Sequence, residues 1–431
     1  MQFQIKKTVS IIKKPDGQYL LKTQNDRYWV VSKDVTKIIV LLQQNKLSIE
    51  ELADKLVHDN LSHKGTSFVR ADESFNSALT LTTAELNQLL TQQLANKGLF
   101  THEADIETQS IMWVRVPIIK GVGIRAITFF GQHLFHRVVI LPSIFLSLLI
   151  IGYFMSTEVF GHYAPKDLSR LISQYQGNEL FLIYCLMTVS MLIHEMGHAS
   201  ALAHYNKRCK NIGFGLYWVL FVFYADVTEA WELKPEERLS VDLGGIFFQM
   251  ILLTLMILIY YFSILTDYSS IILLVVFGNV IAMVVNLLPI LKLDGYWIVA
   301  DFLNITNLAE KSLNSCKQIL FNKVLNKKLN FEPRIDFDCL STFKKYFLGI
   351  YLSFATVALI FFMGYGLTMG LHYLINFPYL FTESINTLQQ LSTDQWLSPL
   401  FAIFVKGLIC LSFLVLFIRL FVISIKGLKF L

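Results

Sequence analysis

The chain has 431 residues, of which 54% are hydrophobic and only 16% are charged, and its formal net charge is +5. Soluble globular domains carry about 25% charged residues, so this composition excludes an ordinary soluble protein and favours a membrane protein. The positive charge is not gathered in a basic tail or an arginine-rich block, which argues against a nucleic-acid partner. The five cysteines never form a C-x-x-C pair, so neither a disulfide framework nor a thiolate metal site is predicted.

Residues 1–105 are predicted to form a small cytosolic domain of mixed α and β structure. The N-terminus is polar and lacks the apolar segment of a cleavable signal peptide. Stretches of alternating polarity predict three short strands, and a Pro15-Asp16-Gly17 turn separates the first two. The predicted strands are 8–13, 18–23 and 27–31.

Two capping boxes predict helices after these strands. Ser48 and Glu51 form the S-x-x-E pattern ahead of an apolar run, and Thr82 and Glu85 repeat the pattern. A β-ribbon combined with helices of this size indicates a winged-helix-like module.

Several segments of this domain resemble a PqqD-like peptide-recognition domain. They are Tyr28-Trp29-Val30-Val31, the apolar helix at 38–42, Leu47-Ser48-Ile49-Glu50-Glu51-Leu52 and Leu94-Ala95-Asn96-Lys97-Gly98-Leu99-Phe100. In that family the module binds the leader of a ribosomally made, modified peptide along a strand edge. The resemblance therefore implies a peptide ligand for residues 1–105, and the alternative is a winged-helix cap that binds no peptide.

Six later stretches approach the length of about 20 mostly apolar residues that a bilayer-spanning helix needs. They are 138–156, 179–203, 243–264, 270–291, 347–375 and 399–425, the last interrupted by Lys406 and Arg419. The apolar run 212–225 is too short to span as a helix and predicts a re-entrant or in-plane hairpin. The predicted fold class is therefore mainly α: a polytopic helical membrane protein with about six transmembrane helices, a hairpin and the N-terminal α+β domain.

Lysine and arginine are concentrated in alternate loops. Nine lie in 292–346, whereas 157–178 holds two and 376–398 holds none. By the positive-inside rule, this pattern predicts a multi-pass protein of the cell membrane with both termini cytoplasmic. The predicted parts after the N-terminal domain are an interfacial linker (106–137), a membrane core (138–301), a cytosolic basic loop (302–346) and a C-terminal transmembrane pair (347–431).

The second predicted span contains the sequence His194-Glu195-Met196-Gly197-His198. Histidines four residues apart on a helix present both imidazoles on one face, which suits binding of one Zn²⁺ ion. Glu195 follows the first histidine and is placed to take a proton from a metal-activated water. Ionisable residues inside an apolar span are costly unless something satisfies them, and a bound cation would do so.

Catalytic zinc usually has three protein ligands, and Asp294 is the candidate for the third. The second and fourth predicted spans both run from outside to inside, so Asp294, just beyond the fourth, is expected at the depth of the histidines. Pro289 breaks the helix before it and lets the backbone turn toward the metal.

HEMGHA on one span and N-x-x-P-x-x-x-L-D-G at the end of another resemble the site-2 protease family of intramembrane zinc proteases. The resemblance covers about 179–301. It implies that His194, His198 and Asp294 bind zinc, that Glu195 is the catalytic base, and that Asn286 helps to bind substrate or the oxyanion. The family often has a second glycine after the aspartate, where this chain has Tyr296-Trp297, and a Gly-Pro between the two motifs, where this chain has Gly244-Gly245.

The expected activity is zinc-dependent hydrolysis of a peptide bond at the cytoplasmic side of the bilayer. If the N-terminal resemblance holds, the substrate is a small ribosomally made peptide, matured beside a peptide exporter. One alternative is cleavage of a membrane-bound regulator such as an anti-sigma factor. Another is a non-catalytic protein for peptide export or immunity with structural zinc, against which the retained Glu195 argues. A prenyl-protease-type enzyme is disfavoured because no second motif supplies a glutamate ligand at the right depth.

Overall fold

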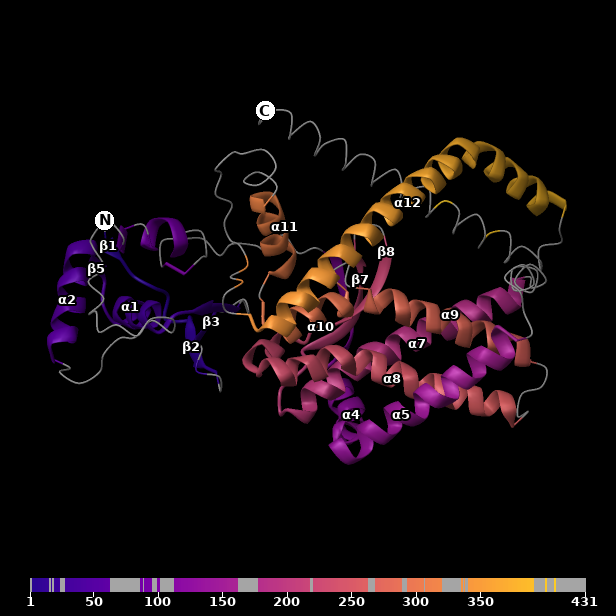
Figure 1. Cartoon of the computed structure of the whole chain (residues 1–431), viewed down its shortest axis with the longest axis horizontal. Coiled ribbons are helices and arrows are strands. Elements are labelled where there is room, and N and C mark those ends of the chain that lie inside the picture. Colours follow the sequence, from indigo (N-terminus) through magenta and orange to yellow (C-terminus); the bar gives the residue numbers. More distant parts are fainter. Residues whose placement is uncertain are drawn as a thin grey trace. The chain divides into compact units, whose positions relative to one another are not determined.

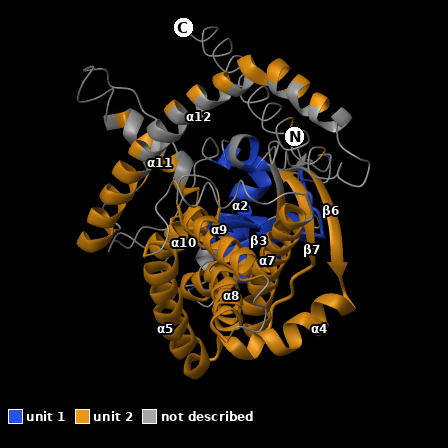
Figure 2. Ribbon diagram, turned by 90° about the vertical axis from the view of Figure 1, so that its right-hand side faces the viewer, with its two compact units in different colours: residues 1–110, 231–234 blue, residues 111–230, 235–431 orange. Residues whose placement is uncertain are grey.

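The computed structural model describes most of the chain and divides it into two compact units. The described residues are 2–14, 17, 19–23, 28–62, 86–87, 89–94, 99–100, 112–161, 177–217, 220–262, 268–288, 293–305, 307–319, 335, 337, 340–390, 400 and 407. Unit 1 is Met1–Ser110 with Trp231–Lys234, and unit 2 is Ile111–Ala230 with Pro235–Leu431 (Figure 2). The short segment 231–234 thus belongs to unit 1, although the residues before and after it in the chain belong to unit 2.

Unit 1 contains the three strands predicted from alternating polarity. Strands β2 (Ser10–Lys13), β3 (Tyr19–Lys22) and β4 (Tyr28–Val31) form an antiparallel sheet in chain order. A second, two-stranded sheet pairs β1 (Gln2–Phe3) with β5 (Leu47–Ser48). The sequence therefore predicted the larger sheet correctly and missed the smaller one, whose strands have only two residues each.

The helices of unit 1 begin at side-chain caps. Ser32 accepts a hydrogen bond from the backbone N–H of Val35 and starts α1 (Lys33–Gln44). At the start of α2 (Ile49–Ser62), the backbone N–H of Ser48 donates to Glu51, and the N–H of Glu51 donates to the Ser48 hydroxyl. This is the predicted capping box. The second one, at Thr82 and Glu85, lies outside the described residues. After it, residues 86–87 and the π-helical segment η1 (Leu89–Leu94) are described.

Four helices of unit 2 are long and apolar enough to cross a membrane. They are α5 (Arg137–Phe154) with its π-helical continuation η3 (Met155–Val159), α7 (Gly177–His204), α8 (Pro235–Tyr261) and α9 (Ser269–Leu287) (Figure 1). They correspond to the first four predicted spans. The fifth lies within the long helix α12 (Thr342–Gln390), and almost all of the sixth, 399–425, lies outside the described residues. The described residues thus contain four candidate membrane spans by length and composition, and the predicted total of six is not shown.

Helices α7 and α8 approach each other closely at small residues. A Cβ added to Gly197 would lie 2.2 Å from the carbonyl oxygen of Gly244, so the contact admits no larger side chain at this point. Apolar side chains of α5, η3, α8 and α9 form the adjacent core, which includes Phe154, Leu253, Ile257 and Val276. The close contact brings α8 directly against the face of α7 that carries the two histidines.

A three-stranded antiparallel sheet lies beside these helices in the fold of unit 2. Its order is β6 (Met112–Lys120), β7 (Asn211–Tyr217) and β8 (Leu220–Ala225). The predicted hairpin at 212–225 is thus formed by β7 and β8, although its insertion in a bilayer is not established. Strand β6 belongs to the stretch expected to be a linker, and it is followed by α4 (Val122–Gly131) and the 3-10 helix η2 (Gln132–Phe135).

The remaining elements connect β8 to α8 and follow α9. The 3-10 helix η4 (Thr228–Glu232) precedes α8, and α10 (Asp294–Leu303) and α11 (Leu308–Ile319) follow α9. Asp294 is the first residue of α10, and it follows the end of α9 at Leu287 by seven positions. Asn304 ends this helix in the left-handed conformation with φ of 58°, a usual C-terminal signal.

Candidate metal centre

Helix α7 presents His194 and His198 side by side. The two residues are one helical turn apart, and their Nε2 atoms are separated by 3.1 Å. Both side chains are buried, with 2% of His194 and 7% of His198 exposed. When the Nε2 atoms of both rings present their lone pairs to each other in an apolar interior, a bound cation can accept both of them.

Asp294 meets both histidines from the start of α10. Its Oδ2 atom lies 2.8 Å from Nε2 of His194 and 3.3 Å from Nε2 of His198. One ligand atom from each of the three residues lies within 4.8 Å of the others. Among the described residues, this is the group of three histidine, cysteine or acidic side chains that could hold a metal ion. The three predicted ligands are therefore brought together from two helices, α7 and α10, although His194 and Asp294 are 100 residues apart in the chain.

The spacing of the three atoms suits a tetrahedral metal ion. Zinc binds imidazole nitrogen and carboxylate oxygen at about 2.0–2.2 Å, so two ligand atoms of a tetrahedral site lie about 3.3 Å apart. The separations of 3.1 and 3.3 Å are close to this value, whereas the 2.8 Å between Asp294 and His194 is a hydrogen-bond distance that a bound ion would widen. Gly245 of α8 keeps the space open, because a Cβ at this position would lie 2.4 Å and 2.5 Å from the two Nε2 atoms.

Glu195 lies next to the converging atoms and is not one of them. Its side chain is 9% exposed, and the backbone N–H of Ala225, the last residue of β8, donates to its carboxylate. The hairpin strand β8 and the histidine helix therefore meet at this residue. A carboxylate has two oxygens with about four lone-pair positions, so Glu195 keeps acceptor capacity for a proton beside the candidate metal site.

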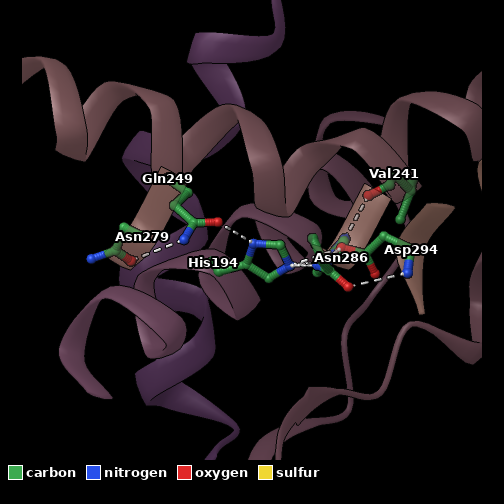
Figure 3. Close-up of polar contacts among 7 residues, drawn as sticks. His194, Val241, Gln249, Asn279, Asn286 and Asp294 are labelled. Carbon is green, nitrogen blue, oxygen red and sulfur yellow. Dashed lines mark hydrogen bonds and ion pairs between the residues drawn. The ribbon is translucent and has the colours of Figure 1, made fainter. Parts of the chain in front are cut away.

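Asn286 reaches the same centre from the last turn of α9. Its Nδ2 atom lies 2.7 Å from Oδ2 of Asp294 and 3.3 Å from Nε2 of His194 (Figure 3). The backbone N–H of Asp294 points back to Oδ1 of Asn286 at 3.5 Å. Asn286 is thus in contact with two of the predicted ligands.

Comparison with known proteins agrees with a metal-dependent protease. Over 136 residues the chain is 28% identical to a Bacillus subtilis (strain 168) protein named "Putative peptide zinc metalloprotease protein YydH". The match covers 31% of this chain and 52% of that protein, so it spans about half the length of the relative. No protein-family model matches the chain, and no solved structure matches it. A metalloprotease relationship is supported, and no PqqD-like domain is shown.

Sequence reasoning missed two buried amides behind His194. Gln249 of α8 lies with Oε1 at 3.3 Å from Nδ1 of His194, and its Nε2 donates to Oδ1 of Asn279 at 3.0 Å (Figure 3). Nδ1 of His198 contacts the carbonyl oxygen of Val241 at 2.8 Å. The signal available in the sequence was the presence of amide residues within two apolar spans, Gln249 in one and Asn279 in the other, and such residues have no characteristic spacing.

A buried ion pair that the sequence did not reveal joins α8 to α10. The guanidinium of Arg238 donates to both carboxylate oxygens of Asp301, with N···O distances of 2.8 to 2.9 Å. Only 6% of the arginine side chain and 13% of the aspartate side chain are exposed. The pair fixes the helix whose first residue is Asp294.

Proposed function

We propose that this protein is a membrane-embedded zinc metalloendopeptidase of the site-2 protease type. The observation that carries the proposal is the convergence of His194, His198 and Asp294 within a few ångströms, beside a buried Glu195. A purely structural zinc site has four protein ligands and needs no adjacent base, whereas a catalytic site keeps one position open. Three converging ligands with a neighbouring carboxylate fit the catalytic type.

A zinc ion held by these three residues would act as a Lewis acid toward water and toward the scissile carbonyl. Glu195 accepts a proton from the attacking water while the water oxygen bonds to the carbonyl carbon. As the C–N bond breaks, Glu195 returns the proton to the leaving amine. The buried location of the carboxylate excludes competing bulk water, which supports its assignment as the proton carrier.

Asn286 is proposed to serve the same reaction. Its amide N–H groups lie beside Asp294 and His194, where a carbonyl oxygen that gains negative charge would need a donor. The carbonyls of a helical substrate are already hydrogen-bonded, so the cleaved segment must unwind locally before it can enter the site. We therefore expect cleavage near small or helix-breaking residues.

A small peptide is the substrate class that we favour, with cleavage at the cytoplasmic side of the membrane. The printed name of the Bacillus subtilis relative refers to a peptide zinc metalloprotease, and the α+β unit 1 is a candidate for binding a leader peptide. The chain is proposed to cross the membrane several times with both termini in the cytoplasm, as its loop charges predict. A peptide exporter is the proposed neighbour that would receive the matured product.

The test separates metal binding from catalysis. Purified protein is expected to contain about one zinc ion per chain, as the three-ligand group found among the described residues implies. The double variant His194→Ala/Asp294→Ala is expected to lose the metal. Glu195→Gln is expected to keep the metal and lose cleavage, and Thr254→Val, which removes a hydroxyl that donates to the carbonyl of Met250 in its own helix, serves as the matched control.

The substrate can be identified with the same Glu195→Gln variant. Crosslinking in cells that make the protein should trap a peptide whose leader binds unit 1, and trapping of a membrane-bound regulator would favour the alternative substrate class. Processing that continues unchanged in Glu195→Gln would overturn the proposal of a protease.

A further inference from the structure

A line of hydrogen-bonded side chains runs through the interior behind His194. Oε1 of Gln249 lies 3.3 Å from Nδ1 of His194, and Nε2 of Gln249 donates to Oδ1 of Asn279 at 3.0 Å (Figure 3). Nδ2 of Asn279 donates to the backbone carbonyl of Val275 at 2.9 Å, and the hydroxyl of Ser190 donates to Oδ1 of Asn279. Gln249 and Asn279 are 1% and 0% exposed, so water does not compete for these groups.

Each amide in this line has its orientation set by the next one. A backbone carbonyl only accepts hydrogen bonds, so the carbonyl of Val275 requires the NH₂ group of Asn279. Oδ1 of Asn279 then faces Gln249 and accepts, which requires the NH₂ group of Gln249 on that side. Rotation of either amide by 180° would place two acceptors against each other in a buried region, at a cost of a lost hydrogen bond and a repulsive contact.

The last step of the line determines the tautomer of His194. Oε1 of Gln249 can only accept, so Nδ1 of His194 must carry the hydrogen. The lone pair of the ring is therefore on Nε2, which faces Asp294 at 2.8 Å. His198 reaches the same state more directly, because its Nδ1 lies 2.8 Å from the carbonyl oxygen of Val241.

We propose that Gln249, held in orientation by Asn279, is a positioning residue that keeps His194 in the metal-binding tautomer and ring orientation. The inference rests on the proposed metal site and concerns how strongly that site binds zinc. The carbonyl of Val275 in α9 sets the orientation of Asn279, Asn279 sets that of Gln249 in α8, and Gln249 sets that of His194 in α7. The competing explanation is that the two amides only join α8 to α9, and that zinc affinity does not depend on them.

Substitutions that match the shape of Gln249 separate these two explanations. Gln249→Met fills nearly the same volume and removes the acceptor that faces Nδ1. Gln249→Glu keeps an acceptor there, and a protonated carboxyl group at this position also keeps a donor toward Asn279. Asn279→Leu leaves Gln249 in place and removes the group that orients it. Thr254→Val on the same helix is the matched control outside the line.

Zinc dissociation constants are measured on the purified full-length protein by competition with a chromophoric chelator, and thermal unfolding checks the fold of each variant. Gln249→Met should weaken zinc binding about 10- to 100-fold, the usual effect of losing a group that orients a metal ligand. Gln249→Glu and Thr254→Val should stay close to the wild type. Asn279→Leu should weaken binding, and adding it to Gln249→Met should cause no further loss, because it acts through Gln249.

Equal zinc affinity in Gln249→Met and the wild type would overturn the positioning role. Equal losses in Gln249→Met and Gln249→Glu would also overturn it, as would additive losses in the double variant. If both Gln249 variants failed to fold, the residue would be assigned to structure alone. Failure of the wild-type protein to bind zinc would instead refute the proposed function, so the two failures are distinguishable.

Discussion

The side-chain amide of Asn286 donates a hydrogen bond of 2.7 Å to Oδ2 of Asp294, the same oxygen that lies 2.8 Å from Nε2 of His194. The backbone N–H of Asp294 in turn donates to Oδ1 of Asn286, with an N···O distance of 3.5 Å. The residue near the end of α9 therefore holds the first residue of α10 by both its side chain and its backbone. From this contact we predict that Asn286 orients the proposed ligand Asp294, in addition to the substrate role that the resemblance of its motif implies.

Replacing Asn286 with alanine separates these two roles. If Asn286 orients Asp294, Asn286→Ala should raise the zinc dissociation constant about tenfold or more, because the carboxylate loses the donor that fixes its rotamer. The measurement is chelator competition on purified protein, together with a cleavage assay at saturating zinc. An unchanged zinc affinity with a large loss of cleavage would contradict the ligand-placing role and assign Asn286 to the substrate alone.

A methyl group at Gly245 should exclude the metal. Its Cβ would lie 2.4 Å from Nε2 of His194 and 2.5 Å from Nε2 of His198, and both rings are fixed on their other nitrogen. Overpacking of this kind costs about 1–3 kcal/mol even where neighbours can shift. If this cost falls on the metal-bound form, Gly245→Ala should lower zinc affinity by roughly five- to 150-fold while the fold persists, since 1.4 kcal/mol corresponds to a factor of ten.

The control for this substitution is Gly152→Ala on α5, where an added Cβ has no atom within 4 Å. That variant should bind zinc like the wild type and unfold at the same or a slightly higher temperature, because alanine favours helix more than glycine does. Zinc content by elemental analysis gives the comparison. Normal zinc binding by Gly245→Ala would show that the metal does not occupy the space between the two histidines.

Parts of the site follow from the sequence for clear physical reasons. A four-residue spacing on a helix dictates that His194 and His198 share a face, and the topology of two parallel spans places Asp294 at the same depth. The sequence could not predict Gln249 or Asn279 as partners. Whether a buried amide contacts a histidine depends on how α8 and α9 rotate about their axes, and uniformly apolar spans do not encode that rotation.

The fold shows the same division between local and long-range information. The capping box at Ser48 and Glu51 and the apolar spans are local signals, and the structure contains them. The pairing of β6 with β7 joins segments about a hundred residues apart, with register shifts along the ladder. Nothing in the composition of 112–120 specifies that partner, since a half-apolar strand can pair with many edges.

The ion pair between Arg238 and Asp301 should be important for stability. Removing one partner of a buried ion pair costs about 3–5 kcal/mol. Arg238→Leu or Asp301→Leu should lower the thermal unfolding temperature in detergent, and the double variant should be closer to the wild type than either single variant. Glu236→Gln, at an exposed position on the same helix, should have little effect. Equal stability of the wild type and Asp301→Leu would contradict a structural role for the pair.

The thiol of Cys209 should be unreactive near neutral pH. Burial, together with the nearby negative charge of Asp226, raises the pKa of this thiol to about 12. Alkylating reagents attack the thiolate, so a raised pKa means that the reactive form is scarce at pH 8. A variant that keeps Cys209 as its only cysteine should react with iodoacetamide roughly a thousandfold more slowly than an exposed cysteine with a pKa of about 8.5.

The dependence of this rate on pH gives the sharper test. Because the thiolate fraction grows tenfold per pH unit until the pKa is reached, the native protein should react faster with each step up to about pH 11. The same variant unfolded in sodium dodecyl sulfate should level off above about pH 9, as an ordinary cysteine does. A native rate that also levels off at pH 9 would show that the thiol ionises normally and would contradict the raised pKa.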